Sequence, residues 1–215
     1  MRIKVCGMKE AENIRELLDL QPDYLGLIFF EKSPRFVGES LDPDVVREIP
    51  RSVRKVGVFV NASIDQVIRT VKKYALDFVQ LHGEETPDFC RSLQFKGINI
   101  IKAFRVDDTF QFSQLNNYKP VCDYFLFDTK GNQYGGTGVA FDWSLLERYD
   151  NEKPFFLSGG IGPEDAEVIL DLKDRTGLKI HAVDINSKFE IEPGLKDIAL
   201  VRDFIERLKA EEIEA

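Results

Sequence analysis

Short apolar runs rich in β-branched and aromatic residues recur along the chain, with amphipathic segments between them. The runs are nearly continuous rather than alternating, which is typical of parallel strands whose sheet is covered by helices. They predict eight strands, at residues 3–6, 24–29, 55–59, 78–81, 98–103, 124–128, 155–158 and 180–185. The amphipathic segments predict helices near residues 10–20, 42–49, 64–74, 86–93, 109–116, 142–149, 163–173 and 197–209.

Strands and helices thus alternate along the whole chain. Eight strand-then-helix units in 215 residues match a compact (β/α)₈ TIM barrel. No linker or change in composition divides the chain, so we expect a single α/β domain over residues 1–215. A doubly wound open sheet is the alternative, but its nucleotide-binding form carries Gly-x-Gly-x-x-Gly after the first strand. Here Cys6-Gly7-Met8-Lys9 follows that strand, and the fingerprint is absent.

The net charge restricts the choice of partners. The formal charge is −8, and part of the excess comes from Glu206, Glu211, Glu212 and Glu214 near the C-terminus. Binding of nucleic acid depends on clustered Lys and Arg, so we expect no nucleic-acid partner. A few basic residues in a cleft can still recognise an anionic small molecule.

Cysteine and histidine usage indicates the compartment and argues against a metal. The N-terminal residues enter a strand pattern directly, so we expect no signal peptide, and no apolar run is long enough to span a membrane. Cys6, Cys90 and Cys122 cannot all pair within the chain, and we interpret them as free thiols in the cytoplasm. His82 and His181 are the only histidines, which argues against a multi-histidine metal site.

In a barrel of this kind, the residues that act lie at the carboxyl ends of the strands. Asp128 stands where the apolar run of the sixth strand stops, directly before a glycine-rich loop. Poor solvation there would raise the pKa of its carboxyl toward values useful for proton donation. Alternatively, Asp128 merely caps a turn, because Asp near Gly is a common turn signal.

Cys6 ends the first strand and precedes Gly7. Small free cysteines are often inert apolar residues of the core, and we expect Cys90 and Cys122 to be of that kind. Lys4 lies two residues before Cys6, so both side chains point to the same side of the strand. A thiol in that position can act as a base if neighbouring charge lowers its pKa.

Three glycine-rich or polar loops follow late strands and indicate an anion site. Ser158-Gly159-Gly160 ends the seventh strand, Asp184 and Asn186-Ser187 end the eighth, and Gly135-Gly136 belongs to the loop after the sixth. Loops after strands seven and eight commonly bind phosphate in these barrels, through backbone N–H groups and a helix N-terminus. Each loop alone is also compatible with an ordinary glycine turn, but together they favour a phosphate site.

Two further residues follow earlier strands. Arg35 lies in the loop after the second strand and can pair with a substrate carboxylate through two parallel hydrogen bonds; the alternative is a surface arginine. For His82 we expect a structural or positioning role, because no sequence neighbour completes a catalytic triad.

Taken in order, these segments resemble the phosphoribosylanthranilate isomerase family of tryptophan biosynthesis. The likeness spans nearly the whole chain, and the ordered set is far more specific than any one motif. The segments are Lys4-Val5-Cys6-Gly7-Met8, Gly26-Leu27-Ile28-Phe29 with Ser33-Pro34-Arg35, Gly57-Val58-Phe59-Val60-Asn61, Val79-Gln80-Leu81-His82-Gly83, Asp128 with Gly135-Gly136-Thr137-Gly138, Leu157-Ser158-Gly159-Gly160-Ile161 and Val183-Asp184-Ile185-Asn186-Ser187.

The resemblance implies an internal redox rearrangement, without cofactor or metal, of N-(5-phosphoribosyl)anthranilate to 1-(2-carboxyphenylamino)-1-deoxyribulose 5-phosphate. It implies that Cys6 is the general base, Asp128 the general acid and Arg35 the group that holds the anthranilate carboxylate. The implied phosphate loops are those of Gly136, Gly159-Gly160 and Asn186-Ser187, and the implied assembly is a monomer or homodimer.

The chain departs from the family pattern at two places. Met8 stands where Ile or Leu followed by Thr is frequent, and Asn186-Ser187-Lys188-Phe189-Glu190 replaces a more usual Ser-Ser-Gly-Val-Glu. Among rival barrels, a ribulose-phosphate epimerase would need metal-binding histidines. An indoleglycerol-phosphate synthase would need a lysine-rich site and usually a longer N-terminal extension. A non-catalytic phosphosugar-binding barrel would need neither Cys6 nor Asp128.

Overall fold

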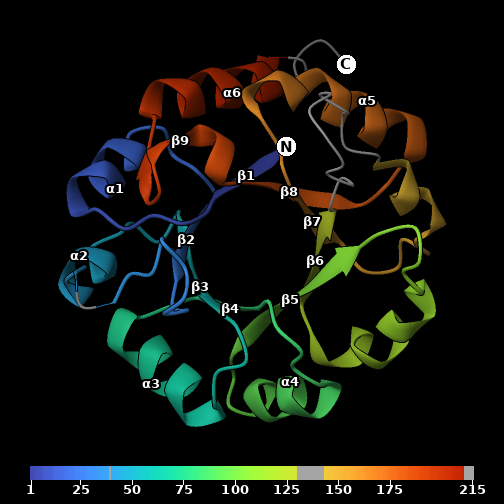
Figure 1. Cartoon of the computed structure of the whole chain (residues 1–215), viewed down its shortest axis with the longest axis horizontal. Coiled ribbons are helices and arrows are strands. Elements are labelled where there is room, and N and C mark those ends of the chain that lie inside the picture. Colours follow the sequence, from blue (N-terminus) through green and yellow to red (C-terminus); the bar gives the residue numbers. More distant parts are fainter. Residues whose placement is uncertain (39, 130–142, 211–215) are drawn as a thin grey trace.

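The computed structural model describes residues 1–38, 40–129 and 143–210. Eight parallel strands form a closed barrel in which each strand pairs with the next and the last pairs with the first. Figure 1 looks along the barrel and shows the helices as a ring outside the strands. The predicted TIM barrel is confirmed. Its strands are β1 Arg2–Val5, β2 Tyr24–Ile28, β3 Arg54–Phe59, β4 Phe78–Leu81, β5 Asn99–Val106, β6 Tyr124–Thr129, β7 Phe155–Ser158 and β8 Ile180–Ile185.

The outer ring contains both α-helices and 3₁₀ helices. Several α-helices begin at a side-chain cap; for example, Ser63 Oγ accepts a hydrogen bond from the backbone of Gln66 at 3.2 Å. The α-helices are α1 Ala11–Leu18, α2 Pro43–Arg47, α3 Ile64–Tyr74, α4 Pro87–Gln94, α5 Ala166–Thr176 and α6 Ile198–Ala210. The 3₁₀ helices are η1 Phe112–Asn117, η2 Lys119–Val121, η3 Trp143–Arg148, η4 Pro163–Asp165 and η5 Ser187–Phe189.

Two of the predicted helices are 3₁₀ helices rather than α-helices. The 3₁₀ helices η1 and η3 overlap the segments predicted at 109–116 and 142–149. In η1 only Leu115 is buried, and Ser and Asn, which occupy positions 113 and 116, are poor formers of α-helix interiors. Neither propensity nor packing therefore extends η1 into a longer α-helix.

A two-stranded hairpin after β8 was not predicted. β9 Glu190–Glu192 pairs antiparallel with β10 Leu195–Lys196, and Gly194 makes the turn at a φ of 96°. Each strand is too short to give an apolar pattern in the sequence. In Figure 1 the β9 strand lies between α1 and the barrel mouth near β1.

The interior of the barrel explains how the strands position a site. An inner core cluster contains Leu126, Phe156 and Ala182 among its seven buried residues. Side chains alternate between the two faces of a strand, so the residue two positions later also points inward. That residue is Asp128 after Leu126, Ser158 after Phe156 and Asp184 after Ala182. The apolar rows inside the barrel thus end in polar groups at the carboxyl ends of β6, β7 and β8.

Most of the apolar core lies between the strands and the surrounding helices, as the continuous apolar strand runs require. Among the residues that the structure describes, no helix is both long and apolar enough to cross a membrane.

Candidate active site

The structure brings most of the predicted site residues to one end of the barrel. Cys6 follows β1, while Asp128, Ser158 and Asp184 lie at or near the ends of β6, β7 and β8. The pairing of β6 with β7 places Asp128 directly beside Ser158, and Ser158 Oγ lies 3.5 Å from Asp184 Oδ2. Because all eight strands run parallel, these groups share the carboxyl-terminal mouth.

Cys6 occupies a tight, buried position. The residue is 4% exposed, and its backbone N–H donates to Ile185 O at 2.9 Å. A Cβ built on Gly26 of the adjacent β2 would lie 2.7 Å from Cys6 Sγ, so glycine there makes room for the thiol. Burial raises the pKa of the Cys6 thiol, while the nearby ammonium of Lys4 opposes the shift.

Lys4 places a positive charge next to Cys6. The side chain is fully buried, and Nζ donates to Asp184 Oδ1 at 2.8 Å. Burial lowers the pKa of Lys4, but Asp184 and Cys6 raise it by more, so Lys4 keeps its proton. The sequence prediction that Lys4 and Cys6 point to the same side is confirmed, and a cation is in place to stabilise a thiolate.

Asp128 is held by a hydrogen-bond relay from β4. His82 Nε2 lies 3.3 Å from Asp128 Oδ2, and His82 Nδ1 lies 3.2 Å from Gln80 Nε2. An amide nitrogen only donates, so Nδ1 accepts and Nε2 carries the proton that points at Asp128. Contrary to the prediction of poor solvation, the Asp128 side chain is 25% exposed, because it faces the mouth rather than the core.

Arg35 is held firmly rather than being a free surface residue. The side chain is only 18% exposed. Nε and Nη2 donate to the two carboxylate oxygens of Glu190 at 2.8 and 2.6 Å. Glu190 Oε1 also accepts from Lys196 Nζ at 2.5 Å. Sequence reasoning missed Glu190 and Lys196 as site residues, since both lie in the hairpin that it did not predict.

The loops after β7 and β8 lie side by side, as an anion site would require. Gly159 and Gly160 have φ angles of 97° and 65°, which explains why glycine occupies both positions. Lys188 Nζ lies 3.6 Å from Glu164 Oε1 and links the two loops. Ser187 is exposed, whereas Asn186 Oδ1 is engaged by Lys196 Nζ at 2.9 Å. Gly135 and Gly136 lie outside the described residues.

The chain matches one family over almost its whole length. The model described as "N-(5'phosphoribosyl)anthranilate (PRA) isomerase" matches residues 3–207. A relative of that name from Parabacteroides distasonis is 46% identical over 209 residues, which cover 97% of this chain and 93% of the relative. One from Phocaeicola vulgatus is 41% identical, with 97% and 98% covered. The chain belongs to the phosphoribosylanthranilate isomerase family.

Solved structures of phosphoribosylanthranilate isomerases share the fold. The Thermotoga maritima enzyme superposes with a TM-score of 0.85 at 33% identity, covering 98% of this chain and 99% of the other. Another phosphoribosylanthranilate isomerase, crystallised with reduced 1-(o-carboxyphenylamino)-1-deoxyribulose 5-phosphate, superposes at 0.82 with 30% identity and coverages of 98% and 99%. The resemblance found in the sequence is confirmed, and the chain is an aldose–ketose isomerase of tryptophan biosynthesis.

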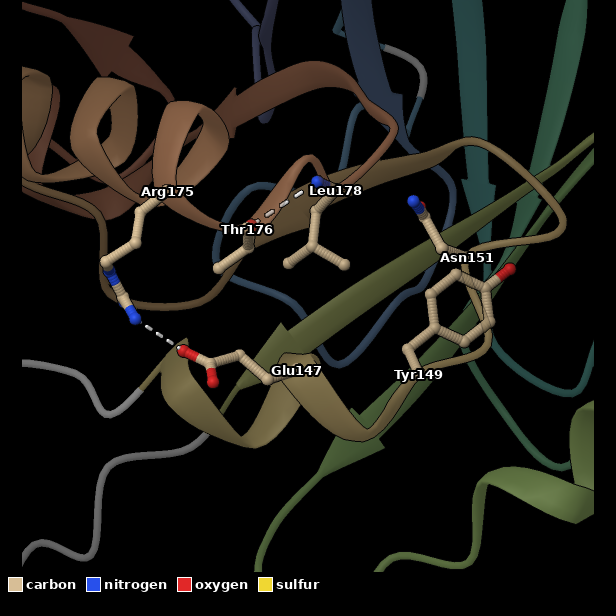
Figure 2. A pocket seen from close by; sticks show the side chains of 6 residues that line it. All are labelled: Glu147, Tyr149, Asn151, Arg175, Thr176 and Leu178. Atoms are coloured by element: carbon tan, nitrogen blue, oxygen red, sulfur yellow. Dashed lines mark hydrogen bonds and ion pairs between the residues drawn. The ribbon is translucent and has the colours of Figure 1, made fainter.

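One hollow of the described surface lies away from the candidate site. Figure 2 shows that Arg175 reaches across it toward Glu147, with a hydrogen bond of 2.8 Å. The lining residues directly precede β7 and β8, so the hollow lies toward the amino-terminal ends of these strands. They are Glu147, Tyr149, Asn151, Arg175, Thr176 and Leu178. Within the described ranges, no group of three or more His, Cys, Asp or Glu side chains is placed to share a metal ion.

Proposed function

We propose that this chain isomerises N-(5-phosphoribosyl)anthranilate with Asp128 as the general acid and Cys6 as the general base. The observation that carries the proposal is their placement. Cys6 and Asp128 lie at the carboxyl ends of inward-facing rows of side chains on two different strands, at the same mouth of the barrel. Lys4 places a cation beside Cys6, and His82 Nε2 is a hydrogen-bond donor beside Asp128.

The reaction begins with opening of the ribose ring. Asp128 gives its proton to the ring oxygen, the C1–O bond breaks, and the nitrogen lone pair forms a C1=N bond, which gives a cationic iminium that keeps its N–H. The carboxylate that remains on Asp128 accepts a hydrogen bond from His82 Nε2, which stabilises it as it forms.

The second step removes a proton from C2. The iminium makes this C–H acidic. The Cys6 thiolate accepts the proton, the C–H electron pair forms a C1=C2 bond, and the C=N π pair returns to nitrogen to give a neutral enolamine. Tautomerisation yields the ketone. Lys4 stabilises the Cys6 thiolate in the buried site. Asp128 and Cys6 suffice for the rearrangement, because the enzyme only donates and accepts protons.

Binding groups surround the acid and the base. We propose that Arg35 holds the anthranilate carboxylate and that backbone N–H groups of Gly159, Gly160 and Ser187 hold the phosphate. Gly135 and Gly136 would contribute from the sixth loop, while Ser158 and Asp184 would contact the sugar. We further propose that the enzyme is a single catalytic domain that works in the cytoplasm as a monomer or homodimer.

The test replaces Asp128 with Asn and follows loss of the fluorescence of phosphoribosylanthranilate. An amide cannot deliver the proton, so Asp128→Asn should fold normally and lose at least about 100-fold in kcat. Asp123→Asn is the matched control: Asp123 lies just before β6, where its carboxylate accepts from Ile100 N at 2.6 Å, and turnover should stay within about twofold. Activity of Asp128→Asn within about tenfold of wild type would remove Asp128 from the acid role.

A further inference from the structure

Arg35, Glu190 and Lys196 form one connected chain of charges beside Cys6. Glu190 is 4% exposed and Lys196 is 0% exposed in their side chains. The Glu190 carboxylate accepts from Arg35 on one side and from Lys196 on the other. Burial raises the pKa of Glu190, but hydrogen bonds from Arg35 and Lys196 lower it by more, so the carboxylate is ionised.

The hydrogen bonds from Arg35 to Glu190 determine which N–H donors of Arg35 remain for a ligand. The carboxylate takes the side edge of the guanidinium, formed by Nε and Nη2. Among the described residues, none accepts a hydrogen bond from Nη1 of Arg35. A guanidinium has five N–H donors in a rigid fork, so the end edge formed by Nη1 and the second hydrogen of Nη2 remains available for another carboxylate.

Lys196 decides the net charge of this arrangement. Arg35 and Glu190 alone form a neutral pair, which attracts an anion poorly. Burial lowers the pKa of Lys196, but the Glu190 carboxylate opposes this shift, and the Lys196 ammonium adds one positive charge 2.5 Å from Glu190. These three groups together therefore carry one net positive charge beside Cys6, although the whole chain carries −8.

The surrounding backbone holds this chain of charges rigidly. Asn13 of α1 clamps the main chain of Lys196 from both sides, accepting from its N–H at 2.8 Å and donating to its carbonyl at 3.0 Å. The backbone N–H of Gly194 donates to Glu190 Oε1 at 3.1 Å. A Cβ built on Gly7 would lie 2.8 Å from Arg35 Cδ, so Gly7 lets the arginine lie close against the loop after β1.

We infer that Glu190 and Lys196 are positioning residues for substrate binding: Glu190 orients Arg35 toward the substrate carboxylate, and Lys196 offsets the charge of Glu190 so that Arg35 acts as a net cation. This inference rests on the proposed role of Arg35. It extends the recognition of the substrate carboxylate to two residues on the β9–β10 hairpin, neither of which touches the substrate.

The test compares Lys196→Met, Glu190→Gln and the double variant, with kcat and KM for phosphoribosylanthranilate measured separately. Lys196→Met leaves a neutral Arg35–Glu190 pair, so KM should rise at least about tenfold, with a smaller change in kcat. Glu190→Gln keeps the shape but loses the charged grip on Arg35, and KM should also rise.

The double variant separates electrostatics from structural damage. Removing Glu190's charge together with that of Lys196 returns the net charge of the cluster to that of Arg35 alone. KM of Glu190→Gln/Lys196→Met should therefore fall below that of Lys196→Met. If the two residues had only a structural role, the double variant would bind substrate no better than either single variant, and that result would overturn the inference.

Two controls make the outcome specific. Lys119→Met removes a lysine that bridges Asp150 and Glu152 at the opposite end of the barrel, and it should leave KM within about twofold. Arg35→Ala tests the proposed role on which the inference rests. Unchanged KM in Arg35→Ala would remove the role of Arg35 itself. Raised KM in Arg35→Ala with unchanged KM in Lys196→Met would refute the inference alone.

Discussion

At the residue scale, the proposed chemistry depends on how the barrel changes the properties of two ordinary side chains. Cys6 is buried between strands and stands beside Lys4, whereas Asp128 faces the mouth and His82. Both residues could be found from the sequence, because each ends an apolar strand directly before or near a glycine. The His82–Asp128 contact could not, since 46 residues separate the two in the chain and only barrel closure brings them together.

The elevated pKa of Cys6 leads to a prediction about its reactivity. Burial raises the pKa of the thiol, so the thiolate fraction is small at neutral pH and grows as the pH rises. In a Cys90→Ala/Cys122→Ala background, iodoacetamide should label Cys6 slowly at pH 7, with a rate that increases up to about tenfold per pH unit. Mass spectrometry of the labelled peptide measures the rate.

Activity should be lost at the same rate as Cys6 becomes labelled, and a product analogue should protect the thiol from labelling. A labelled enzyme that retains full turnover would exclude Cys6 as the base. A labelling rate independent of pH between 7 and 9 would contradict the buried, proton-bearing state of the thiol.

At the element scale, the sequence predicted the eight strands well because each is a buried parallel strand with a continuous apolar run. It failed where an element has no such signal. Residues 109–116 look amphipathic but bury only Leu115, and the β9–β10 hairpin has only three and two residues in its strands. Glu190 and Lys196 were missed for the same reason: nothing local in the sequence indicates that the hairpin folds back onto Arg35.

The loop between β7 and η4 gives a prediction about phosphate binding. Gly160 has a φ of 65°, and its N–H is one of the groups proposed to hold the phosphate. Gly160→Val should raise KM at least about tenfold while kcat changes much less, because the phosphate is an anchor remote from the reacting carbons.

The matched control is Gly97→Val, in the connection between α4 and β5. Gly97 also has a positive φ, 74°, and a Cβ there would meet nothing within 4 Å, so backbone strain is comparable. Its KM should remain near that of wild type. Equal KM values for Gly160→Val and wild type would exclude the proposed phosphate loop.

At the scale of the whole molecule, the two ends of the barrel have different tasks. The carboxyl end carries the proposed catalytic groups, and the amino end contains an aromatic and hydrogen-bonded network around His181. Arg2 Nη1 lies 3.3 Å from His181 Nδ1, and Tyr24 Oη lies 2.7 Å from Nε2. Burial, helped by Arg2, lowers the pKa of His181 to about 4.

This network predicts acid sensitivity of the fold. The unfolded chain binds a proton at His181 below about pH 6.5, whereas the folded chain does so only near pH 4, so stability is lost as the pH falls through that window. The loss should be about 1–3 kcal/mol, reduced by partial exposure. Urea unfolding at pH 7 and 4.5 should show a smaller pH dependence in His181→Gln than in wild type. An identical pH dependence would contradict the neutral state of His181.

The central claim is that Asp128 opens the ring and Cys6 then removes the proton from C2. The most direct measurement is the kinetic isotope effect of substrate carrying deuterium at C2, in wild type, Cys6→Ser and Asp128→Asn. Weakening the base makes C2–H cleavage more rate-limiting, so the isotope effect on kcat should increase in Cys6→Ser. Weakening the acid makes ring opening rate-limiting, so the effect should fall toward unity in Asp128→Asn. The reverse pattern, or equal isotope effects in the two variants, would contradict the assignment.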